Sequence, residues 1–338
     1  MEPQAPVNIK LSLCMIVKDE ESTLADCLKS VRAIVDEIVV VDTGSSDSTV
    51  QVANQFGARV IPHVWKEDFA EARNISLDAA TGNWIIVLDA DEEMDEISRG
   101  AIDGLLESNP ADGYEVTIRN ELPRSDVATY EESRIVRLFR NRREYRYRKS
   151  IHEQIRMSIE SGGGRIAPSS LVIVHHGYAR REVQSGVDRS ARNLNMLRKA
   201  LKDSPEDPYL HFQIGSTLMS IGKRDEARME FDSVLELDYG SLGPAVLDKF
   251  YMKISQLALE NNEYDRALKF AGESLRYNGQ NSISEYVAAI ACLSTNRIQE
   301  GYGYLLRVRD NPKDSLRLKS QLSELIIACE KALGHLPG

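Results

Sequence analysis

The sequence predicts an α/β domain in the first half of the chain and an all-α repeat domain in the second half. Up to about residue 95, short apolar segments alternate with segments whose apolar residues recur at helical spacing, an order typical of a mostly parallel sheet covered by helices. After residue 205, small and aromatic residues recur at spacings near 34, which is typical of stacked helix pairs. The length of 338 residues exceeds what one hydrophobic core usually serves, which also favours two domains.

The composition indicates a soluble globular protein. Hydrophobic residues make up 42% of the chain and charged residues 28%, while the formal net charge of −10 argues against general binding to nucleic acid or anionic membranes. No apolar run reaches the roughly 18 residues that a membrane helix needs. The first ten residues lack the pattern of a secretory signal, so we expect a cytoplasmic protein. The four cysteines form no C-x-x-C pair, so neither a zinc site nor a disulfide framework is expected.

Four strands are predicted from apolar, largely β-branched runs bounded by polar residues, and the first and the fourth are expected to be buried. The expected strands cover residues 11–17, 38–41, 58–62 and 84–88. Helices are expected after Ser22 and after Ser46 or Asp47, because these side chains can cap a helix N-terminus, and again over Phe69–Ala80. The resulting βαβαβαβ order is that of a nucleotide-binding α/β domain.

Carboxylates follow three of these strands. Asp19 and Glu20 follow the first strand, Asp42 follows the second, and Asp89 and Asp91 follow the fourth. Open α/β sheets bind their ligands at the carboxyl ends of the strands. Because Asp89 and Asp91 are two residues apart, an extended backbone would point both to one side, where they could converge on one cation or one ribose. Hard oxygen ligands suit Mg²⁺ or Mn²⁺. The alternative is an acidic turn with no ligand.

Two common nucleotide-binding motifs are absent from the sequence. The segment between Val17 and Val31 contains no glycine, so no G-x-G-x-x-G turn follows the first strand, and no G-x-x-x-x-G-K-[ST] loop occurs. An NAD enzyme and a P-loop NTPase are therefore improbable. A nucleotidyltransferase would need a glycine-rich first loop with arginine or lysine to hold a triphosphate, and this loop is also missing.

Four blocks within the first 95 residues resemble the nucleotide-sugar domain of the family 2 inverting glycosyltransferases, which adopt the GT-A fold. In chain order they are CMIVKDEESTLADCLKSV, EIVVVDTGSSDST, FAEARN and GNWIIVLDADEE. The family usually has Asn-Glu where this chain has Asp19-Glu20, so only Glu20 matches. The resemblance implies that Asp42 accepts a hydrogen bond from uracil or another base, that Asp89 contacts ribose or metal, and that Asp91 binds the metal.

The same resemblance assigns Val17, Glu20 and Arg73 to donor binding. Arg73 matches the family's Arg-Asn pair, and a fixed guanidinium there could neutralise a diphosphate or hold the Asp89 loop. The alternative for Arg73 is an ion pair with a neighbouring glutamate on the helix surface.

The acceptor side is expected in the segment that follows. Residues 114–119 alternate as a half-exposed strand. Residues 134–148 are rich in arginine and tyrosine, which can bind nucleic acid, although in an acidic protein we expect a solvated face or one that steers an anionic donor or acceptor. His152 and Glu153 follow, and as strand neighbours they would face opposite sides. Family members with appended tetratricopeptide repeats have a similar Ile-His-Glu block, so Glu153 is the candidate catalytic base. The alternative is an ion pair between Glu153 and a nearby arginine.

A second metal ligand is expected after the strand at 171–174. A neutral imidazole binds divalent metals well, and in the GT-A fold a late histidine commonly completes the site begun by the acidic pair. His175 aligns best with the family's H-x-G-Y block, which Gly177 and Tyr178 complete, and His176 is the alternative.

The repeats begin after two prolines, at residues 205 and 208. An offset of 40 from Ala227 to Ala267 indicates about six inserted residues between the first two repeats. We expect an α/β domain over 1–182, a linking helix over 183–204, and a tetratricopeptide-repeat domain over 205–338 with a closing helix over 316–333. The repeat positions are Gly215, Gly222, Ala227 and Phe231, then Tyr251, Asn262, Ala267 and Ala271, then Asn296, Gly301 and Leu305.

Together these features predict a glycosyltransferase that depends on Mn²⁺ or Mg²⁺ and uses a nucleotide-sugar donor, most simply UDP-linked. The architecture resembles bacterial peptide glycosyltransferases that modify Cys or Ser side chains, so we expect a peptide or protein acceptor, with a cell-surface glycan as the alternative. The repeats would bind peptide or pair with a second copy of the chain, unless they only support the catalytic domain. A non-catalytic scaffold that senses a nucleotide is the rival class.

Overall fold

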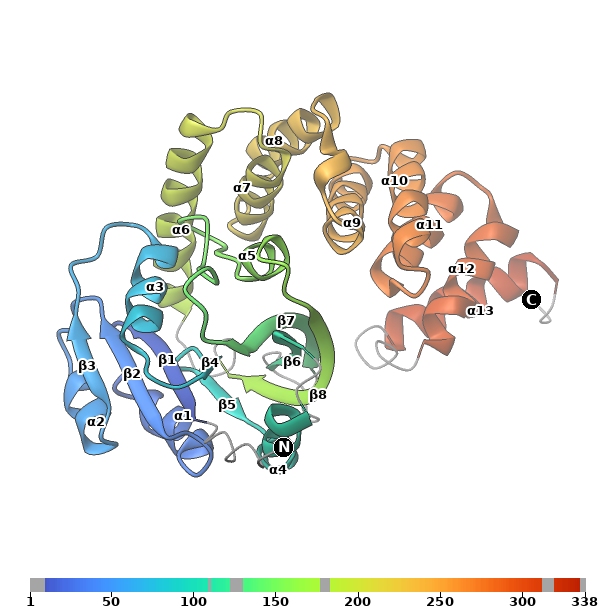
Figure 1. The fold of residues 1–338 in the computed structure, drawn as a ribbon. Coiled ribbons are helices and arrows are strands. Elements are labelled where there is room, and N and C mark those ends of the chain that lie inside the picture. Colours follow the sequence, from blue (N-terminus) through green and yellow to red (C-terminus); the bar gives the residue numbers. More distant parts are fainter. Residues whose placement is uncertain (1–9, 109–110, 122–129, 177–182, 312–318, 335–338) are drawn as a thin grey trace. The chain divides into compact units, whose positions relative to one another are not determined.

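The computed structural model describes residues 10–108, 111–121, 130–176, 183–311 and 319–334. The chain divides into two compact units, Met1–Asp188 and Arg189–Gly338, which are described separately (Figure 1). The boundary lies within the helix α6 (Val183–Asp203). The separation into an α/β domain and a helical domain is therefore confirmed, while the predicted boundaries of the linking helix stay a prediction.

The first unit is built on one mixed sheet of eight strands, in the order β3-β2-β1-β4-β7-β6-β8-β5. Its parallel part is made of β1 (Leu11–Val17), β2 (Glu37–Asp42), β3 (Arg59–Pro62) and β4 (Trp84–Val87), joined by α1 (Leu24–Val31), α2 (Thr49–Gln55) and α3 (Phe69–Ala79). The strand order reverses at β1, which pairs with β2 on one side and β4 on the other (Figure 1). Such a reversal is where open sheets bind ligands, beyond the carboxyl ends of the strands.

The remaining strands extend the sheet beyond β4. They are β5 (Glu92–Met94), β6 (Gly113–Glu121), β7 (Tyr130–Arg140) and β8 (Ile166–His175), with the helices α4 (Glu96–Ser108) and α5 (Arg156–Ser161). β7 is antiparallel to β4 and to β6, and the short β5 is antiparallel to β8, with Glu92 opposite His175. This last pairing brings the acidic segment after β4 beside the end of β8.

Both faces of β1, β2 and β4 are buried, which explains their continuous apolar sequences, whereas the edge strand β3 is partly exposed. Along β1, Leu13 and Met15 belong to the same buried cluster as Leu28 of α1. Cys14, between them, belongs to a second cluster with Leu77 of α3. Because side chains alternate along a strand, the two clusters cover opposite faces of the sheet.

Two local expectations are wrong. β4 ends at Val87 and β5 begins at Glu92, so Asp89 and Asp91 lie in a turn and not in an extended strand. His152 and Glu153 are not strand neighbours either, because β7 ends at Arg140 and only an isolated bridge forms near them, while His152 has a positive φ of 53°. The alternation argument therefore fails for both pairs, since it holds only for extended backbone.

The second unit consists of helix pairs. After α6, they are α7 (Pro208–Ser220) with α8 (Arg224–Glu236), α9 (Pro244–Glu260) with α10 (Tyr264–Tyr277), and α11 (Ser282–Ser294) with α12 (Ile298–Asp310); α13 (Lys319–Ala332) follows. The insertion between the first two pairs contains a short 3₁₀ helix, Tyr239–Ser241. Residues 316–318 of the expected closing helix lie outside the described residues.

Each helix pair turns at one residue with a positive φ. These residues are Gly222 (79°), Asn262 (58°) and Asn296 (59°), and glycine and asparagine tolerate this conformation best. The next N–H donates to a carbonyl five residues back, as from Lys223 to Leu218 at 2.9 Å. The recurrence of the turn confirms the repeats that the sequence predicts.

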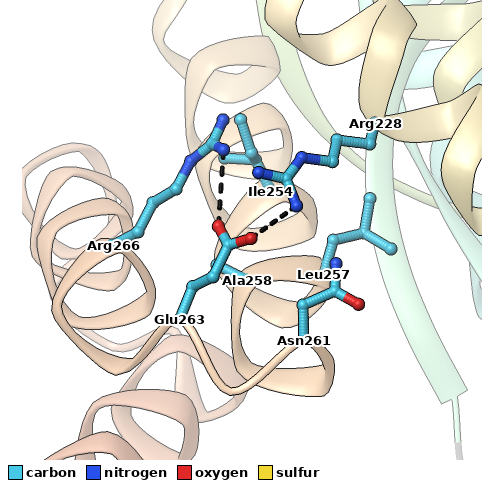
Figure 2. Close-up of a pocket in the computed structure, with 7 residues that line it drawn as sticks. All are labelled: Arg228, Ile254, Leu257, Ala258, Asn261, Glu263 and Arg266. Carbon is cyan, nitrogen blue, oxygen red and sulfur yellow. Dashed lines mark hydrogen bonds and ion pairs between the residues drawn. The ribbon is translucent and has the colours of Figure 1, made fainter.

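The interiors of the pairs explain the small residues of the repeat. A side-chain carbon on Gly215 of α7 would lie 2.5 Å from the ring of Phe231 on α8, so only glycine fits there. Figure 2 shows a small pocket between α8, α9 and α10, where Arg228 and Arg266 pair with Glu263 at 2.5 and 3.4 Å. Both arginines also pair with Asp232, so two carboxylates balance the two charges and we assign this pocket no ligand. Within the described ranges, no helix combines the length and apolar character needed to cross a membrane.

Candidate functional site

The loops after β1 and β2 are fastened to each other by side chains. Oδ1 of Asp19 accepts a hydrogen bond from the Ser46 N–H at 2.7 Å, and Oε2 of Glu21 accepts one from the Ser48 N–H at 2.9 Å. Asp19 has a positive φ of 53°. These carboxylates therefore hold the two loops together beyond the carboxyl ends of β1 and β2.

Three donor-binding candidates lie at or just after the ends of β1 and β2. The Asp42 side chain accepts from the N–H groups of its own turn, at 3.1 Å from Ser45. Oε2 of Glu20 accepts from the Thr23 hydroxyl at 2.9 Å. Val17 is 3% exposed, and its side chain lies in the core. The donor-binding roles of Val17, Asp42 and Glu20 all stay predictions.

Asp89 lies between two buried arginines. Its Oδ1 is 2.7 Å from Nη2 of Arg73 on α3, and its Oδ2 is 2.9 Å from Nη2 of Arg137 on β7. Arg73 also pairs with Glu153 through Nε, at 2.6 Å, and Arg137 pairs with Glu92 at 2.7 Å. The five side chains form one network of buried ion pairs, and Asp89, 37% exposed, is its centre and its most open member.

The ion pairs shift the pKa values of Asp89, Glu92 and the two arginines. Burial acts to raise the pKa of Asp89, but Arg73 and Arg137 outweigh it and hold that pKa well below its usual range. Burial, partly opposed by Arg137 and reinforced by Asp89, raises the pKa of Glu92 to about 7. For Arg73 and Arg137, burial acts to lower the pKa but the carboxylates raise it above its usual value. Both arginines are therefore permanent cations.

Asp91 turns away from this network and faces His175. Nε2 of His175 lies 3.3 Å from Oδ2 of Asp91, whose side chain is 9% exposed. Asp89 and Asp91 therefore do not converge on one ligand through a shared strand face, as the sequence led us to expect. Because of the turn, Asp89 pairs with Arg73 and Arg137, whereas Asp91 faces His175.

The Asp91 and His175 pair fits a divalent cation. Nδ1 of His175 lies 2.8 Å from Oδ1 of Asn120, and when that N–H donates, the lone pair of Nε2 faces Oδ2 of Asp91. Two facing acceptors need a proton or a cation between them. Burial acts to lower the pKa of His175, but Asp91 outweighs it and raises that pKa. An imidazole that donates its other N–H to an oxygen is the common arrangement of a metal-binding histidine.

The protein supplies only part of a metal's ligands at this site. In the portion of the chain that the structure describes, no group of three or more His, Cys, Asp or Glu side chains could hold a metal ion. Mg²⁺-type sites usually combine one or two protein ligands with substrate phosphates and water. The metal-binding roles of Asp91 and His175 stay predictions on this basis.

His176 has other partners. Its Nδ1 lies 2.7 Å from Oε2 of Glu121, and its Nε2 lies 3.3 Å from Oε1 of Glu93. The backbone N–H of His176 donates to the carbonyl of Asp91. Of the two histidines, His175 is therefore the one that faces the Asp91 carboxylate. The rest of the H-x-G-Y block, Gly177 and Tyr178, lies outside the described residues.

Glu153 reaches the network from the loop before α5. Its side chain is 14% exposed, and Oε1 accepts from Nε of Arg73. The alternative for Glu153 was a surface strand residue paired with an arginine. The ion pair is present, but Glu153 lies neither on the surface nor in a strand. The alternative for Arg73 is wrong, because the Arg73 side chain is 8% exposed and does not lie on the helix surface. The role of Glu153 as a base stays a prediction.

The arginine-rich segment after β6 offers no stacking surface. Tyr145 and Tyr147 are buried in the core. Arg142 pairs with Asp112, and Arg146 pairs with Asp78. The tyrosines are unavailable for stacking on bases, which argues against nucleic-acid binding by this segment.

Two residues of the site escaped the sequence analysis, Arg137 and Glu92. Arg137 is one of seven arginines between residues 134 and 148, and nothing in that pattern distinguishes it. One signal was available: Arg137 lies within the apolar run Val136, Leu138 and Phe139, where an arginine is unexpected unless it is paired.

Comparisons with known proteins agree with this architecture. Residues 12–171 match the family model described as Glycosyl transferase family 2. A TPR repeat-containing protein of Synechococcus elongatus is 35% identical over 265 residues, which cover 77% of this chain and 64% of the relative. The SPbeta prophage-derived glycosyltransferase SunS of Bacillus subtilis is 27% identical over 215 residues, 63% of this chain and 50% of that protein. The chain thus spans less than two thirds of either relative.

One solved structure illustrates how distant the structural matches are. It is glucosyl-3-phosphoglycerate synthase from Mycobacterium tuberculosis in complex with Mn²⁺ and UDP-glucose, with 24% identity and a TM-score of 0.30 over 33% of this chain and 44% of that one. A TM-score this low supports no argument about the present chain.

Proposed function

Since residues 12–171 form a glycosyl transferase family 2 domain, we propose that the protein transfers a sugar from a nucleotide-sugar donor, with UDP as the first nucleotide to test. The observation that carries the proposal is the pairing of Asp91 with His175 across 3.3 Å, where the turn after β4 meets the end of β8. Asp42 and Glu20, at the ends of the neighbouring strands, would hold the nucleoside. A relative named as a glycosyltransferase supports the same class of reaction.

Asp91 and His175 would hold Mn²⁺ or Mg²⁺ together with the donor diphosphate. When bound, the cation supplies positive charge that neutralises the departing diphosphate. The nitrogens of Arg73 and Arg137 that already hold carboxylates would not bind the diphosphate. They keep the acidic turn in place, so that Asp91 faces outward from it.

Glu153 is the base of the proposed inverting reaction. Arg73 holds its Oε1, which leaves Oε2 to accept the proton of an acceptor hydroxyl or thiol. The acceptor oxygen or sulfur then forms a bond to the anomeric carbon, opposite the bond to the diphosphate oxygen. That second bond breaks with its electron pair on the leaving nucleoside diphosphate, so a single displacement inverts the configuration.

A peptide or protein side chain is the acceptor we propose. The repeat unit supports this choice, because stacked helix pairs commonly form surfaces that bind extended peptides. A cell-surface glycan is the second candidate acceptor. Pairing of two copies through the repeats and the cytoplasmic location stay predictions from the sequence.

The test is release of UDP from a panel of UDP-sugars, with and without Mn²⁺, followed by mass spectrometry of candidate peptides. Asp91→Ala should lower turnover at least about 100-fold, because a metal ligand supports several kcal/mol of charge stabilisation. Asp103→Ala, which removes an exposed carboxylate from α4, is the matched control and should keep full turnover.

Two results would contradict the proposal. Turnover of Asp91→Ala equal to that of the parent would refute the proposed metal site at Asp91. Binding of UDP with no release from any nucleotide sugar would favour the rival class, a non-catalytic scaffold that senses a nucleotide.

A further inference from the structure

Arg137 is the side chain that ties the acidic turn after β4 to strand β7. A single nitrogen, Nη2, donates to Oδ2 of Asp89 at 2.9 Å and to Oε1 of Glu92 at 2.7 Å. The side chains of Arg137 and Glu92 are 9% and 3% exposed. The contact is therefore built into the protein interior, where a charge is tolerated only with its partners.

Asp89 and Glu92 are the two ends of one four-residue turn. The Glu92 N–H donates to the carbonyl of Asp89 at 3.0 Å, and the Asp89 N–H donates to Oε2 of Glu92 at 2.8 Å. The turn is thus closed by its own backbone and by the Glu92 side chain. Arg137 holds both ends at once, and Asp91 is inside the turn.

The other side of the turn is attached to β8. The carbonyl of Asp91 accepts from the His176 N–H at 3.0 Å, and the Asp91 carboxylate faces Nε2 of His175. The orientation of Asp91 relative to His175 therefore depends on how the two ends of its turn are held.

We propose that Arg137 is a positioning residue that keeps Asp91 aligned with His175 for binding a divalent cation with a nucleoside diphosphate. This inference rests on the proposed function and deepens it. Arg137 itself touches neither Asp91 nor the cation. It acts through Asp89 and Glu92, whose carboxylates would repel each other without the guanidinium between them.

Lysine is a poor substitute at this position, although it keeps the charge. Both contacts come from Nη2, at the far end of the arginine side chain. The lysine side chain is shorter, and its ammonium is a compact and strongly hydrated charge on a flexible chain. In a buried site, Arg137→Lys should hold one end of the turn and release the other. The expected consequence is a weaker metal site in a folded protein.

The experiment measures Mn²⁺ binding to the full chain in the presence of UDP, from the electron paramagnetic resonance signal of free Mn²⁺. Arg137→Lys and Arg137→Met should raise the Mn²⁺ dissociation constant about 10-fold or more, as is typical for residues that orient metal ligands. Arg134→Lys, an exposed arginine on the same strand, is the matched control and should leave the constant unchanged. The concentration of Mn²⁺ that half-saturates UDP release should rise by the same factor.

A purely structural role would give a different pattern. Fewer folded molecules would lower the number of binding sites and the apparent kcat, with the Mn²⁺ dissociation constant unchanged, and this result would overturn the inference. If circular dichroism shows that neither Arg137 variant folds, Glu92→Gln tests the same interaction by changing the carboxylate that Arg137 contacts. This variant should raise the Mn²⁺ constant several-fold, and an unchanged constant in folded Glu92→Gln would also overturn the inference.

The parent protein separates this inference from the proposed function. If the parent binds no Mn²⁺ with UDP and releases UDP from no donor, the proposed function fails, and the inference fails with it. If the parent does both and the Arg137 variants match it, only the role of Arg137 is refuted.

Discussion

Replacing Arg73 by methionine should destabilise the first unit strongly, because Arg73 joins two carboxylates in the interior. Its side chain is 8% exposed and pairs with Asp89 at 2.7 Å and with Glu153 at 2.6 Å. Methionine is similar in length but carries no charge. The variant would leave Glu153, 14% exposed, without its cationic partner.

The size of the effect follows from the burial of the partners. Removing one member of a buried ion pair costs about 3–5 kcal/mol. Asp89 is 37% exposed and keeps Arg137, so solvent screening brings the expected loss to the lower end, about 3 kcal/mol. With a urea slope of roughly 2–3 kcal/mol/M, the unfolding midpoint should fall by about 1–1.5 M.

Tryptophan fluorescence makes the measurement specific for the first unit. The chain has two tryptophans, Trp65 and Trp84, and both lie in that unit, so unfolding of the repeats does not contribute. The control is Arg119→Met, which breaks a pair with Glu132 whose side chains are 40% and 46% exposed, and it should barely move the midpoint. Equal shifts for Arg73→Met and Arg119→Met would refute the reasoning from burial.

Three further outcomes are expected. Glu153→Gln should lower kcat of sugar transfer by about 100-fold or more without weakening UDP binding, since only the proton acceptor is lost. An unchanged kcat in a transfer assay would exclude Glu153 as the base. The pKa of Glu92 is ~4.3 in the unfolded chain and about 7 in the folded protein. Its contribution to folding stability is therefore complete below pH ~4.3, and at most about 3 kcal/mol is lost as the pH rises to 7. In urea unfolding followed by fluorescence, Glu92→Gln should abolish this decrease in stability. Gly215→Ala would place a carbon 2.5 Å from Phe231 and should lower the stability of the repeats by about 1–3 kcal/mol, measured by circular dichroism. The control, Gly272→Ala, places its carbon in open space and should not destabilise the repeats.

Local sequence patterns were sufficient for the architecture. The apolar runs that predict β1, β2 and β4 are buried on both faces of the sheet, as Cys14 and Met15 of β1 illustrate. Gly222, Asn262 and Asn296 were predicted as positions of the repeat, and each has the positive φ of a turn between two helices. Both signals depend on neighbours in the chain, so they can be read without the fold.

The strand-end carboxylates were predicted as a group, but their individual partners were not. The argument for Asp89 and Asp91 assumed an extended backbone, and the chain instead turns between β4 and β5. The turn separates the two side chains, with Asp89 bound to the arginines and Asp91 facing His175. A short acidic segment contains no local signal that distinguishes a strand end from a tight turn.

The sequence by itself determined the order of strands and helices, the repeats, and the residue types available at the sheet's edge. Only the tertiary structure decided which charges meet. Arg73 and Glu153 are separated by 80 residues, and Arg137 and Asp89 by 48. The physical reason is that burial patterns arise from each segment's own periodicity, whereas an ion pair depends on two segments being packed together and removed from water.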